Sequence, residues 1–230
     1  MKISILGTGN VGQTLTAKFV SLGHEVMMGT RNVTTKLASK EKDARGNPPF
    51  AEWHSSNKEV KLGNFAEAAS FGNLIINAIH GNNSLDALKL ALSKNLAGKI
   101  LIDISNPLDF SKGMPPSLIP ELSNTNSLGE EIQKTFPDSK VVKTFNTMWC
   151  GLMVNPGMIG NGDHINYISG NDAEAKKTVR KLIIQMGWKG ENILDLGDIT
   201  AARATEAVLP VWLRIMSTLQ SGAFNFKLVK

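Results

Sequence analysis

The sequence predicts an α/β fold with a doubly wound parallel sheet, and three observations carry this prediction. A glycine-punctuated turn follows the first apolar run directly. Short β-branched runs then alternate with helical patterns along most of the chain, as they do in repeated strand–helix–strand units. The last long pattern, at residues 199–219, is helical. It predicts a small C-terminal helical extension beside the sheet.

The first element is a strand at residues 3–6, which is short, apolar and β-branched, as strands buried on both faces are. A G-x-G-x-x-G turn follows it. In such a turn the first glycine permits the tight bend, the second lets a pyrophosphate approach the backbone, and the third lets the helix lie close to the strand. We expect phosphate binding, at the N-terminus of the following helix, by Gly7, Thr8, Gly9, Asn10, Val11 and Gly12.

The helix after the turn is marked by apolar residues at helical spacing, namely Val11, Leu15, Phe19 and Leu22. Asn10 is expected to be its N-cap and Gly23 to end it. A second strand is expected at residues 24–28. The glycine turn thus lies within a unit of about 30 residues that has the Rossmann pattern, where it is a much stronger sign of dinucleotide binding than it is alone.

The end of the second strand predicts NADP rather than NAD. A protein that binds NAD usually carries an acidic residue roughly 20 residues after the glycines, where it binds the ribose 2′-hydroxyl. Thr30 and Arg31 occupy this place here, and no Asp or Glu occurs between Glu25 and Glu41. A guanidinium binds a 2′-phosphate bidentately, and a threonine hydroxyl donates to it. Lys36 is a further candidate, although a lysine there also fits a solvated helix face.

The next segment, from residue 33 through His54, interrupts the alternation of strands and helices. Residues 33–45 are expected to form a polar helix that ends before the two prolines of residues 46–49. The stretch through Trp53 and His54 is then either a lid near the cofactor or a loop packed on the body of the protein.

Strands and helices then alternate again. We expect strands at residues 60–62, 74–79, 100–104 and 141–145, and helices at 65–70, 85–92 and 128–136. Ligands of doubly wound sheets lie outside the carboxyl ends of the strands. The residues at these ends that we expect near the cofactor are Ala78, Ile79, His80, Asn106, Pro107, Asn146 and Thr147. His80 is a candidate proton carrier or, alternatively, the cap of the next helix. Asn106-Pro107 also fits a rigid Asx turn.

The predicted domains are an NADP-binding Rossmann domain at residues 1–165 and a small C-terminal part, residues 166–230, packed on it. The second part is expected to hold strands at 166–169 and 193–196 and an amphipathic helix between them. The final helix contains Pro210, which should kink it. It carries more apolar residues than one stripe needs, which favours deep burial or a homodimer. Arg203 and Glu206 are expected to form an exposed i, i+3 pair.

The composition of the chain also indicates which kinds of ligand it binds. The net charge is +5 among 230 residues, without an Arg-rich block, which favours anionic small molecules over nucleic acid. Cys150 is the single cysteine, and with four histidines it gives no metal-ligand spacing. No apolar stretch approaches the roughly 18 residues of a membrane-spanning helix, so we expect a cytoplasmic protein without a membrane contact.

With these residues in place, the chain resembles the NADP oxidoreductases that depend on the deazaflavin coenzyme F420, a family whose domain also occurs in ferric reductases of animal membranes. The resemblance spans nearly the whole chain and rests on residues 5–12, 23–26, 29–31, 103–107, 141–147 and 194–197. It implies 2′-phosphate binding at Thr30, Arg31 and Lys36, and nicotinamide contacts at the strand ends given above. It also implies direct hydride transfer to a stacked deazaflavin or flavin ring, which needs alignment rather than a nucleophile or a metal.

The chain departs from the family pattern at two places. It inserts residues 40–57, and it carries Asn146 where relatives show a histidine. Both departures fall near the pocket for the second ring, so coenzyme F420 and a flavin both stay open as co-substrate. Two alternatives also remain: an NADPH-dependent flavin or ferric reductase module, and a non-catalytic NADP-sensing protein.

Overall fold

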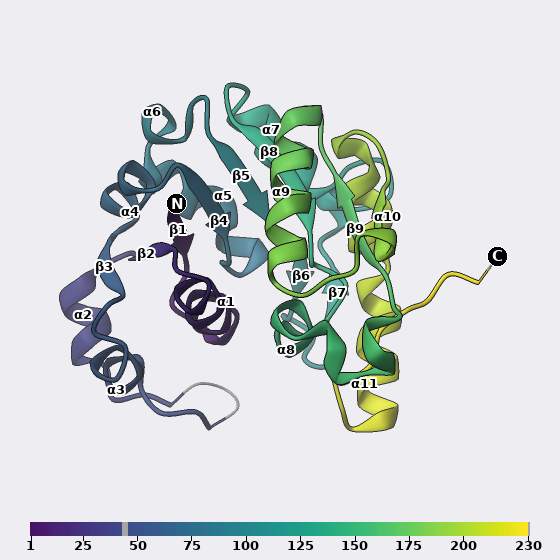
Figure 1. The fold of residues 1–230 in the computed structure, drawn as a ribbon, viewed down its shortest axis with the longest axis horizontal. Helices are drawn as coiled ribbons and strands as arrows, with labels where there is room; N and C mark the ends of the chain where they lie inside the picture. The colour runs from purple at the N-terminus through teal and green to yellow at the C-terminus, as the bar shows by residue number, and fades with distance from the viewer. Residues whose placement is uncertain (43–45, 230) are drawn as a thin grey trace.

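The computed structural model describes residues 1–42 and 46–229. Across these residues, eight strands form one sheet in the order β10-β9-β8-β5-β4-β1-β2-β3 (Figure 1). Neighbouring strands run parallel, except that β9 is antiparallel to β8. The predicted doubly wound α/β fold is therefore confirmed. The chain order reverses between β1 and β4, which is where dinucleotides bind in such sheets.

The strands of this sheet are β1 (Lys2–Leu6), β2 (Glu25–Thr30), β3 (Lys61–Asn64), β4 (Leu74–Asn77), β5 (Ile100–Asp103), β8 (Lys140–Thr144), β9 (Asn166–Ser169) and β10 (Ile193–Asp195). Each of them was predicted, with ends that differ by at most two residues. A separate hairpin of β6 (Leu108–Asp109) and β7 (Ser117–Leu118) was not predicted, because these two-residue strands leave no pattern in a proline-rich loop.

The α-helices are α1 (Asn10–Ser21), α2 (Val33–Ala38), α3 (Phe50–Ser55), α4 (Phe65–Phe71), α5 (Gly81–Ala91), α6 (Ser93–Leu96), α7 (Leu128–Thr135), α8 (Cys150–Val154), α9 (Ala173–Gln185), α10 (Ala202–Ala207) and α11 (Leu209–Leu219). Single 3-10 turns lie at Pro120–Leu122, Pro156–Met158, Gly160–Gly162, Gly190–Asn192 and Ile199–Ala201. Within the described residues, no helix is long and apolar enough to cross a bilayer.

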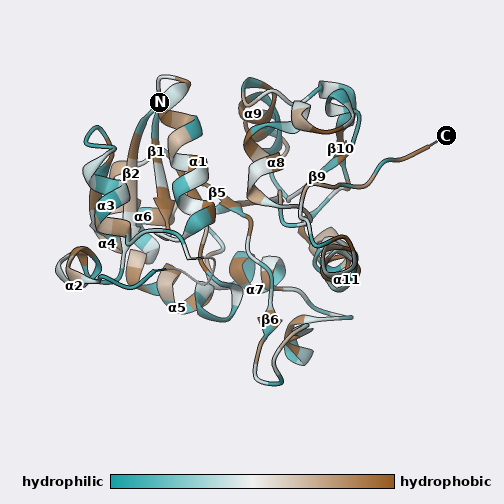
Figure 2. Ribbon diagram, turned by 90° about the horizontal axis from the view of Figure 1, so that it is seen from below, coloured by the Kyte–Doolittle hydropathy of each residue, from teal (hydrophilic) through white to brown (hydrophobic). Residues whose placement is uncertain are grey.

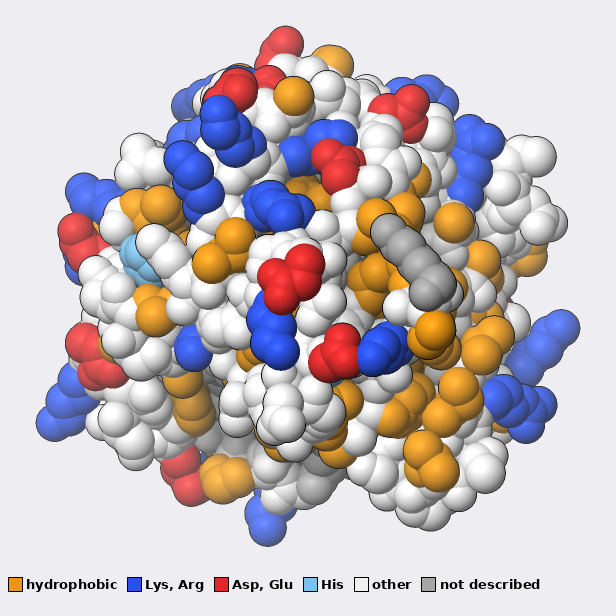
Figure 3. All heavy atoms as spheres, turned by 45° about the vertical axis from the view of Figure 1, so that its right-hand side comes forward, with side chains coloured by type: hydrophobic (Ala, Val, Ile, Leu, Met, Phe, Trp, Pro, Cys, Tyr) orange, Lys and Arg blue, Asp and Glu red, His pale blue; other side chains and the backbone are white. Residues whose placement is uncertain are grey.

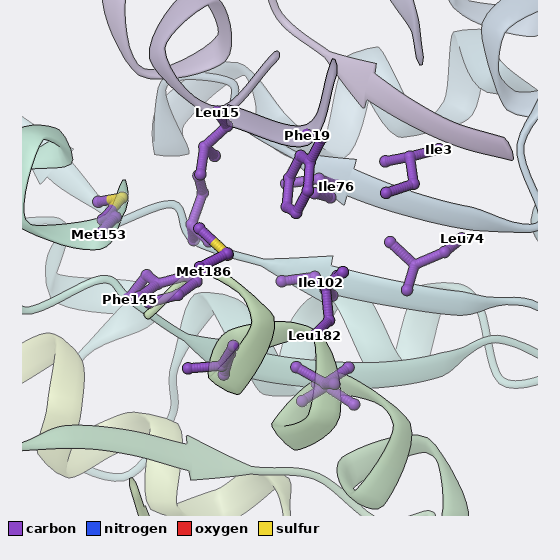
Figure 4. Close-up of a cluster of buried hydrophobic side chains, with 14 of the residues drawn as sticks. Ile3, Leu15, Phe19, Leu74, Ile76, Ile102, Phe145, Met153, Leu182 and Met186 are labelled. Atoms are coloured by element: carbon purple, nitrogen blue, oxygen red, sulfur yellow. The ribbon is translucent and has the colours of Figure 1, made fainter. Parts of the chain in front are cut away.

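Helices cover the sheet on both faces (Figure 2). On one face, α1, α8 and α9 bury the larger apolar cluster, in which Phe19 of α1 faces Ile76 of β4 (Figure 4). On the other face, α4, α5 and α7 bury a second cluster around Leu88 and Ile132. Burial on both faces explains why the strands read as continuous apolar runs.

The segment after β2 differs from its prediction. The helix expected at residues 33–45 ends at Ala38, because α2 buries no side chain that would extend it; residues 43–45 lie outside the described part of the chain. The stretch through Trp53 and His54 forms α3, whose Phe50 is buried with Met28 and Val60. Of the two predicted possibilities, the structure therefore shows a segment packed on the body of the protein.

The C-terminal helix was expected to kink at Pro210, and the structure interrupts it close by, at Val208 between α10 and α11. Val208 keeps a helical conformation, with φ −68° and ψ −26°. Pro210 has no N–H to continue the hydrogen-bond ladder. The predicted surface pair of Arg203 with Glu206 is wrong. Arg203 Nε donates instead to Glu130 of α7 at 2.8 Å, and Glu206 is buried, because α10 packs across the start of α7. Since β9 and β10 extend the main sheet, the domain division at residue 165 stays a prediction.

Candidate functional site

The glycines of the turn are required for different reasons. Gly7 has a φ of +117°, and a Cβ there would lie 2.6 Å from the carbonyl oxygen of Ala78. At Gly12 a Cβ would overlap the carbonyl oxygen of Gly7. A Cβ at Gly9, however, would meet no protein atom within 4 Å. The structure thus explains the first and third glycines by close approach of the backbone, and it leaves open space at the second, which fits the approach of a pyrophosphate.

The N-terminus of α1 faces this open space. Its N-cap is Gly9 rather than Asn10 as predicted, and no described side chain caps it. Asn10 is already helical, and its Nδ2 contacts Cys150 Sγ of α8 at 3.5 Å instead. The first N–H groups of α1 therefore remain available to the oxygens of a phosphate.

The residues predicted for the 2′-phosphate lie at the end of β2 and on the helix that follows it. Thr30 is buried at the last position of the strand, and Arg31 is exposed beside it. The side chain of Asn32 then accepts from the Thr35 N–H at 2.9 Å and begins α2. This helix carries Lys36, whose Nζ lies 5.5 Å from the ring centre of Phe50 in α3. The inserted α3 therefore helps to place the second of the two cations.

The loops after β4, β5 and β8 meet at the other end of the site. Asn106 Nδ2 donates to the carbonyl oxygen of Asn146 at 2.8 Å, and Asn146 Nδ2 donates to Asn106 Oδ1 at 3.0 Å. A Cβ at Gly81 would overlap the carbonyl oxygen of Asn106, so the loop after β4 touches the same turn. The structure brings the predicted nicotinamide residues together, while their contact with a cofactor stays a prediction.

His80 lies at the N-cap position of α5 but makes no capping hydrogen bond with its side chain. Its ring contacts Phe110 edge to face at 5.5 Å between ring centres. His80 therefore occupies the predicted cap position, but its side chain does not cap the helix. Proton transfer by His80 stays a prediction.

Sequence reasoning missed a buried ionic cluster beneath these loops. Lys143 Nζ lies 2.8 Å from Asp103 Oδ2 and 2.7 Å from Glu206 Oε1. Burial disfavours the charged ammonium, but the two carboxylates outweigh it and raise the pKa of Lys143. Burial raises the pKa of Glu206 as well, against the opposing effect of Lys143. The available signal was a charged residue near the end of each of two strands that read as buried.

A cavity of about 640 Å³ lies beside the loop after β8. Trp149 of this loop lines it together with Met114 and Pro115 from the β6–β7 hairpin, and Leu213 and Arg214 of α11 form the other side. Figure 3 shows the face that carries the C-terminal segment, where hydrophobic side chains are exposed between charged ones. The cavity offers an aromatic ring, apolar walls and one cation.

Comparison with known proteins agrees with this architecture. The family described as NADP oxidoreductase, coenzyme F420-dependent, matches residues 2–107. A crystal structure from Arthrobacter sp. FB24, described as a candidate F420-dependent NADP-reductase, is 50% identical, covers 100% of both chains and has a TM-score of 0.94. A reductive aminase from Aspergillus terreus is 15% identical over 96% of this chain and 62% of its own, with a TM-score of 0.63, and shares the fold alone.

Two curated relatives are longer proteins. Metalloreductase STEAP3 of Rattus norvegicus is 30% identical over 229 residues, which are 97% of this chain and 40% of the relative. Metalloreductase STEAP2 of Homo sapiens is 28% identical over 206 residues, which are 89% of this chain and 35% of the relative. The chain therefore spans well under half the length of the metalloreductases that it matches.

Proposed function

The chain belongs to the coenzyme F420-dependent NADP oxidoreductase family and is an NADP-dependent oxidoreductase, and from this premise we propose that it transfers a hydride between nicotinamide and a planar deazaflavin or flavin ring. When bound, NADPH supplies the hydride from its nicotinamide ring. The protein supplies binding, alignment and exclusion of water.

The position of the loop after β8 is the main support for this proposal. Its Asn146 is hydrogen-bonded to Asn106 in the loop after β5, and three residues later its Trp149 lines the cavity. A ring seated against Trp149 would thus lie next to the expected nicotinamide position. Hydride transfer between two rings needs this proximity more than it needs an acid or a base.

The residues of the adenosine half support NADP over NAD. Thr30 is the last residue of β2, Arg31 follows it directly, and Lys36 lies on the next helix. The open space at Gly9 and the uncapped α1 accommodate the pyrophosphate between the two halves. Residues 7–12, 30–31, 36, 78–80, 106–107 and 146–147 would together form one extended NADP site.

The test is oxidation of NADPH by the purified protein, with deazaflavin, FMN, FAD and a ferric chelate offered separately and NADH as the control donor. Turnover with deazaflavin or a flavin, and preference for NADPH, would support the proposal. Tight binding of NADPH without turnover of any acceptor would contradict it and favour an NADP-sensing protein.

The second candidate is a reductase module that passes electrons from NADPH to a flavin or ferric iron held by a partner. The similarity to two metalloreductases favours it, although the chain spans only 40% and 35% of their lengths. Turnover of the ferric chelate that depends on added flavin would favour this candidate over the deazaflavin reaction.

We also propose that the protein forms a homodimer through α11. Its buried side carries Trp212 and Leu213, while Val211 and Leu219 are 54% and 57% exposed. Apolar residues on both sides of one helix are more typical of a shared helix than of a solvated one. A solution mass equal to one chain would contradict this proposal.

A further inference from the structure

Three ionisable side chains lie in the interior directly beneath the turn that holds Asn106. Asp103 is fully buried, and Lys143 and Glu206 are each 1% exposed. Besides its two carboxylate contacts, Lys143 Nζ donates to the carbonyl oxygen of Ser105 at 2.6 Å. The three N–H groups of the ammonium thus have three acceptors, one of which is the backbone of the turn itself.

The excess negative charge of the cluster also has partners. Glu206 accepts from the backbone N–H groups of Leu128 and Gly129, at 2.9 and 3.0 Å, where α7 begins. Asp103 accepts from Asn77 Nδ2 at 2.9 Å and from Ser105 Oγ at 2.6 Å. The cluster is therefore fully hydrogen-bonded, and it joins β4, β5, β8, α7 and α10 beneath one turn.

Stability alone does not account for such a cluster. Taking charges out of water carries a large penalty, and well-packed apolar residues often replace a buried ionic triad with no loss of stability. What an apolar replacement would not reproduce is the hydrogen bond from Lys143 to the Ser105 carbonyl. This bond fixes the backbone one residue before Asn106, whose side chain joins the loop after β8.

We propose that Lys143 is a positioning residue for the nicotinamide half of the site, and that Glu206 connects the C-terminal α10 to it. Lys143 touches neither ring of the reaction and acts through the turn at residues 105–107. The inference rests on the proposed function for the place of the nicotinamide. It predicts that loss of Lys143 disturbs the nicotinamide half of the site and leaves the adenosine half intact.

The test uses a variant pair that separates positioning from stability. Lys143→Met leaves two uncompensated carboxylates in the interior and should lower the melting temperature strongly. Lys143→Met/Glu206→Leu removes one of the two carboxylates that Lys143→Met leaves without a cation, so part of the lost melting temperature should return, while Asp103 keeps its hydrogen bonds from Asn77 and Ser105. The matched control is Arg203→Met, because Arg203 also joins α10 to α7 through Glu130 but does not touch the turn.

The readouts are the dissociation constants of NADPH and of 2′,5′-ADP, which lacks the nicotinamide half, and the fluorescence of the bound nicotinamide. The double variant should bind 2′,5′-ADP like the wild type, bind NADPH more weakly, and show altered nicotinamide fluorescence. Its kcat for hydride transfer should fall about 10- to 100-fold, as expected from a small misplacement of reacting groups. Arg203→Met should change none of these values.

Two results would overturn the inference. If the double variant recovers wild-type NADPH binding, fluorescence and kcat together with its stability, the cluster is structural only. If NADPH and 2′,5′-ADP weaken equally, Lys143 does not act on the nicotinamide half. Failure of the proposed function is distinguishable, because it would appear as wild-type protein that binds no NADPH or turns over no acceptor.

Discussion

The open space at Gly9 gives the most specific prediction at the scale of single residues. Gly9→Val should abolish binding of NADPH while the melting temperature stays near the wild-type value, because the side chain would fill the space proposed for the pyrophosphate and its Cβ would meet no protein atom within 4 Å. Titration with NADPH checks this. The control is Gly157→Val, where a Cβ would also have room. Unchanged affinity in Gly9→Val would place the dinucleotide elsewhere.

Arg31 gives the second residue-scale prediction. Arg31→Ala should weaken binding of NADPH by about 1.5–3 kcal/mol, the usual size of a hydrogen bond to a charged group, and should leave NADH almost unaffected. The measurement is the ratio of the two dissociation constants in the variant and in the wild type. Lys58→Ala removes an exposed cation away from the end of β2 and serves as the control. Equal losses for both nucleotides would refute the role in 2′-phosphate binding.

Local sequence predicted where residues lie when their positions depend on a single segment. The glycine turn and Thr30-Arg31 belong to one unit of about 30 residues, so their spacing alone indicated their places. The hydrogen bond between Asn106 and Asn146 joins loops 40 residues apart, and Glu206 of α10 contacts Lys143 of β8. The second contact depends on how α10 packs across α7, which an i, i+3 spacing does not reveal. Glu206 was therefore misassigned to the surface.

At the scale of elements, α3 depends on one buried ring. Phe50 is 4% exposed and packs with Met28 and Val60. Phe50→Ala should lower the free energy of unfolding by about 3 kcal/mol, the lower end for such truncations in a core. Denaturant unfolding measures this. Phe50→Leu should cost less because most of the apolar volume remains. A negligible effect of Phe50→Ala would show that α3 is not anchored through this ring.

The link between α7 and α10 predicts a dependence of stability on pH. Burial disfavours the charge of Glu130, but hydrogen bonds from Arg203 and Ser127 outweigh it and hold its pKa below the ordinary 4.5. A carboxylate whose pKa is lowered by folding stabilises the fold at pH values above its pKa in the unfolded state. This contribution is lost as the pH falls through its pKa in the folded state. Glu130→Gln should therefore melt below the wild type near neutral pH.

The difference in melting temperature between Glu130→Gln and the wild type should shrink as the pH falls below 4.5 and through the folded-state pKa. Thermal melts across the acid range measure it. A difference that stays constant down to the lowest pH would mean that the charge of Glu130 has no part in the link.

Elements with a dense apolar run or a long apolar period were predictable. The strands of the main sheet are short but carry apolar runs, and α9 repeats its apolar residues along 13 residues. By contrast, α2 and α3 have six residues each, and their limits are set by Asn32, Ser39 and the burial of Phe50 rather than by a period. Tertiary contacts therefore determine where such short helices begin and end.

At the scale of the whole molecule, the sheet places two groups of residues at opposite ends of one site. The end of β2 and the helix after it carry the cations that we propose for a 2′-phosphate. The loops after β4, β5 and β8, which we propose for the nicotinamide, lie on the other side of the reversal between β1 and β4. The cluster around Lys143 then ties the C-terminal helices to the second group. The proposed roles of all three groups of residues require the same orientation of the dinucleotide.

The most direct measurement is therefore a crystal structure of the protein with NADP⁺. We predict that the 2′-phosphate lies against Arg31, the pyrophosphate at Gly9, and the nicotinamide ring beside Asn106 and Asn146 with its reactive face open toward Trp149. A dinucleotide bound in the opposite direction, or bound away from the glycine turn, would contradict it.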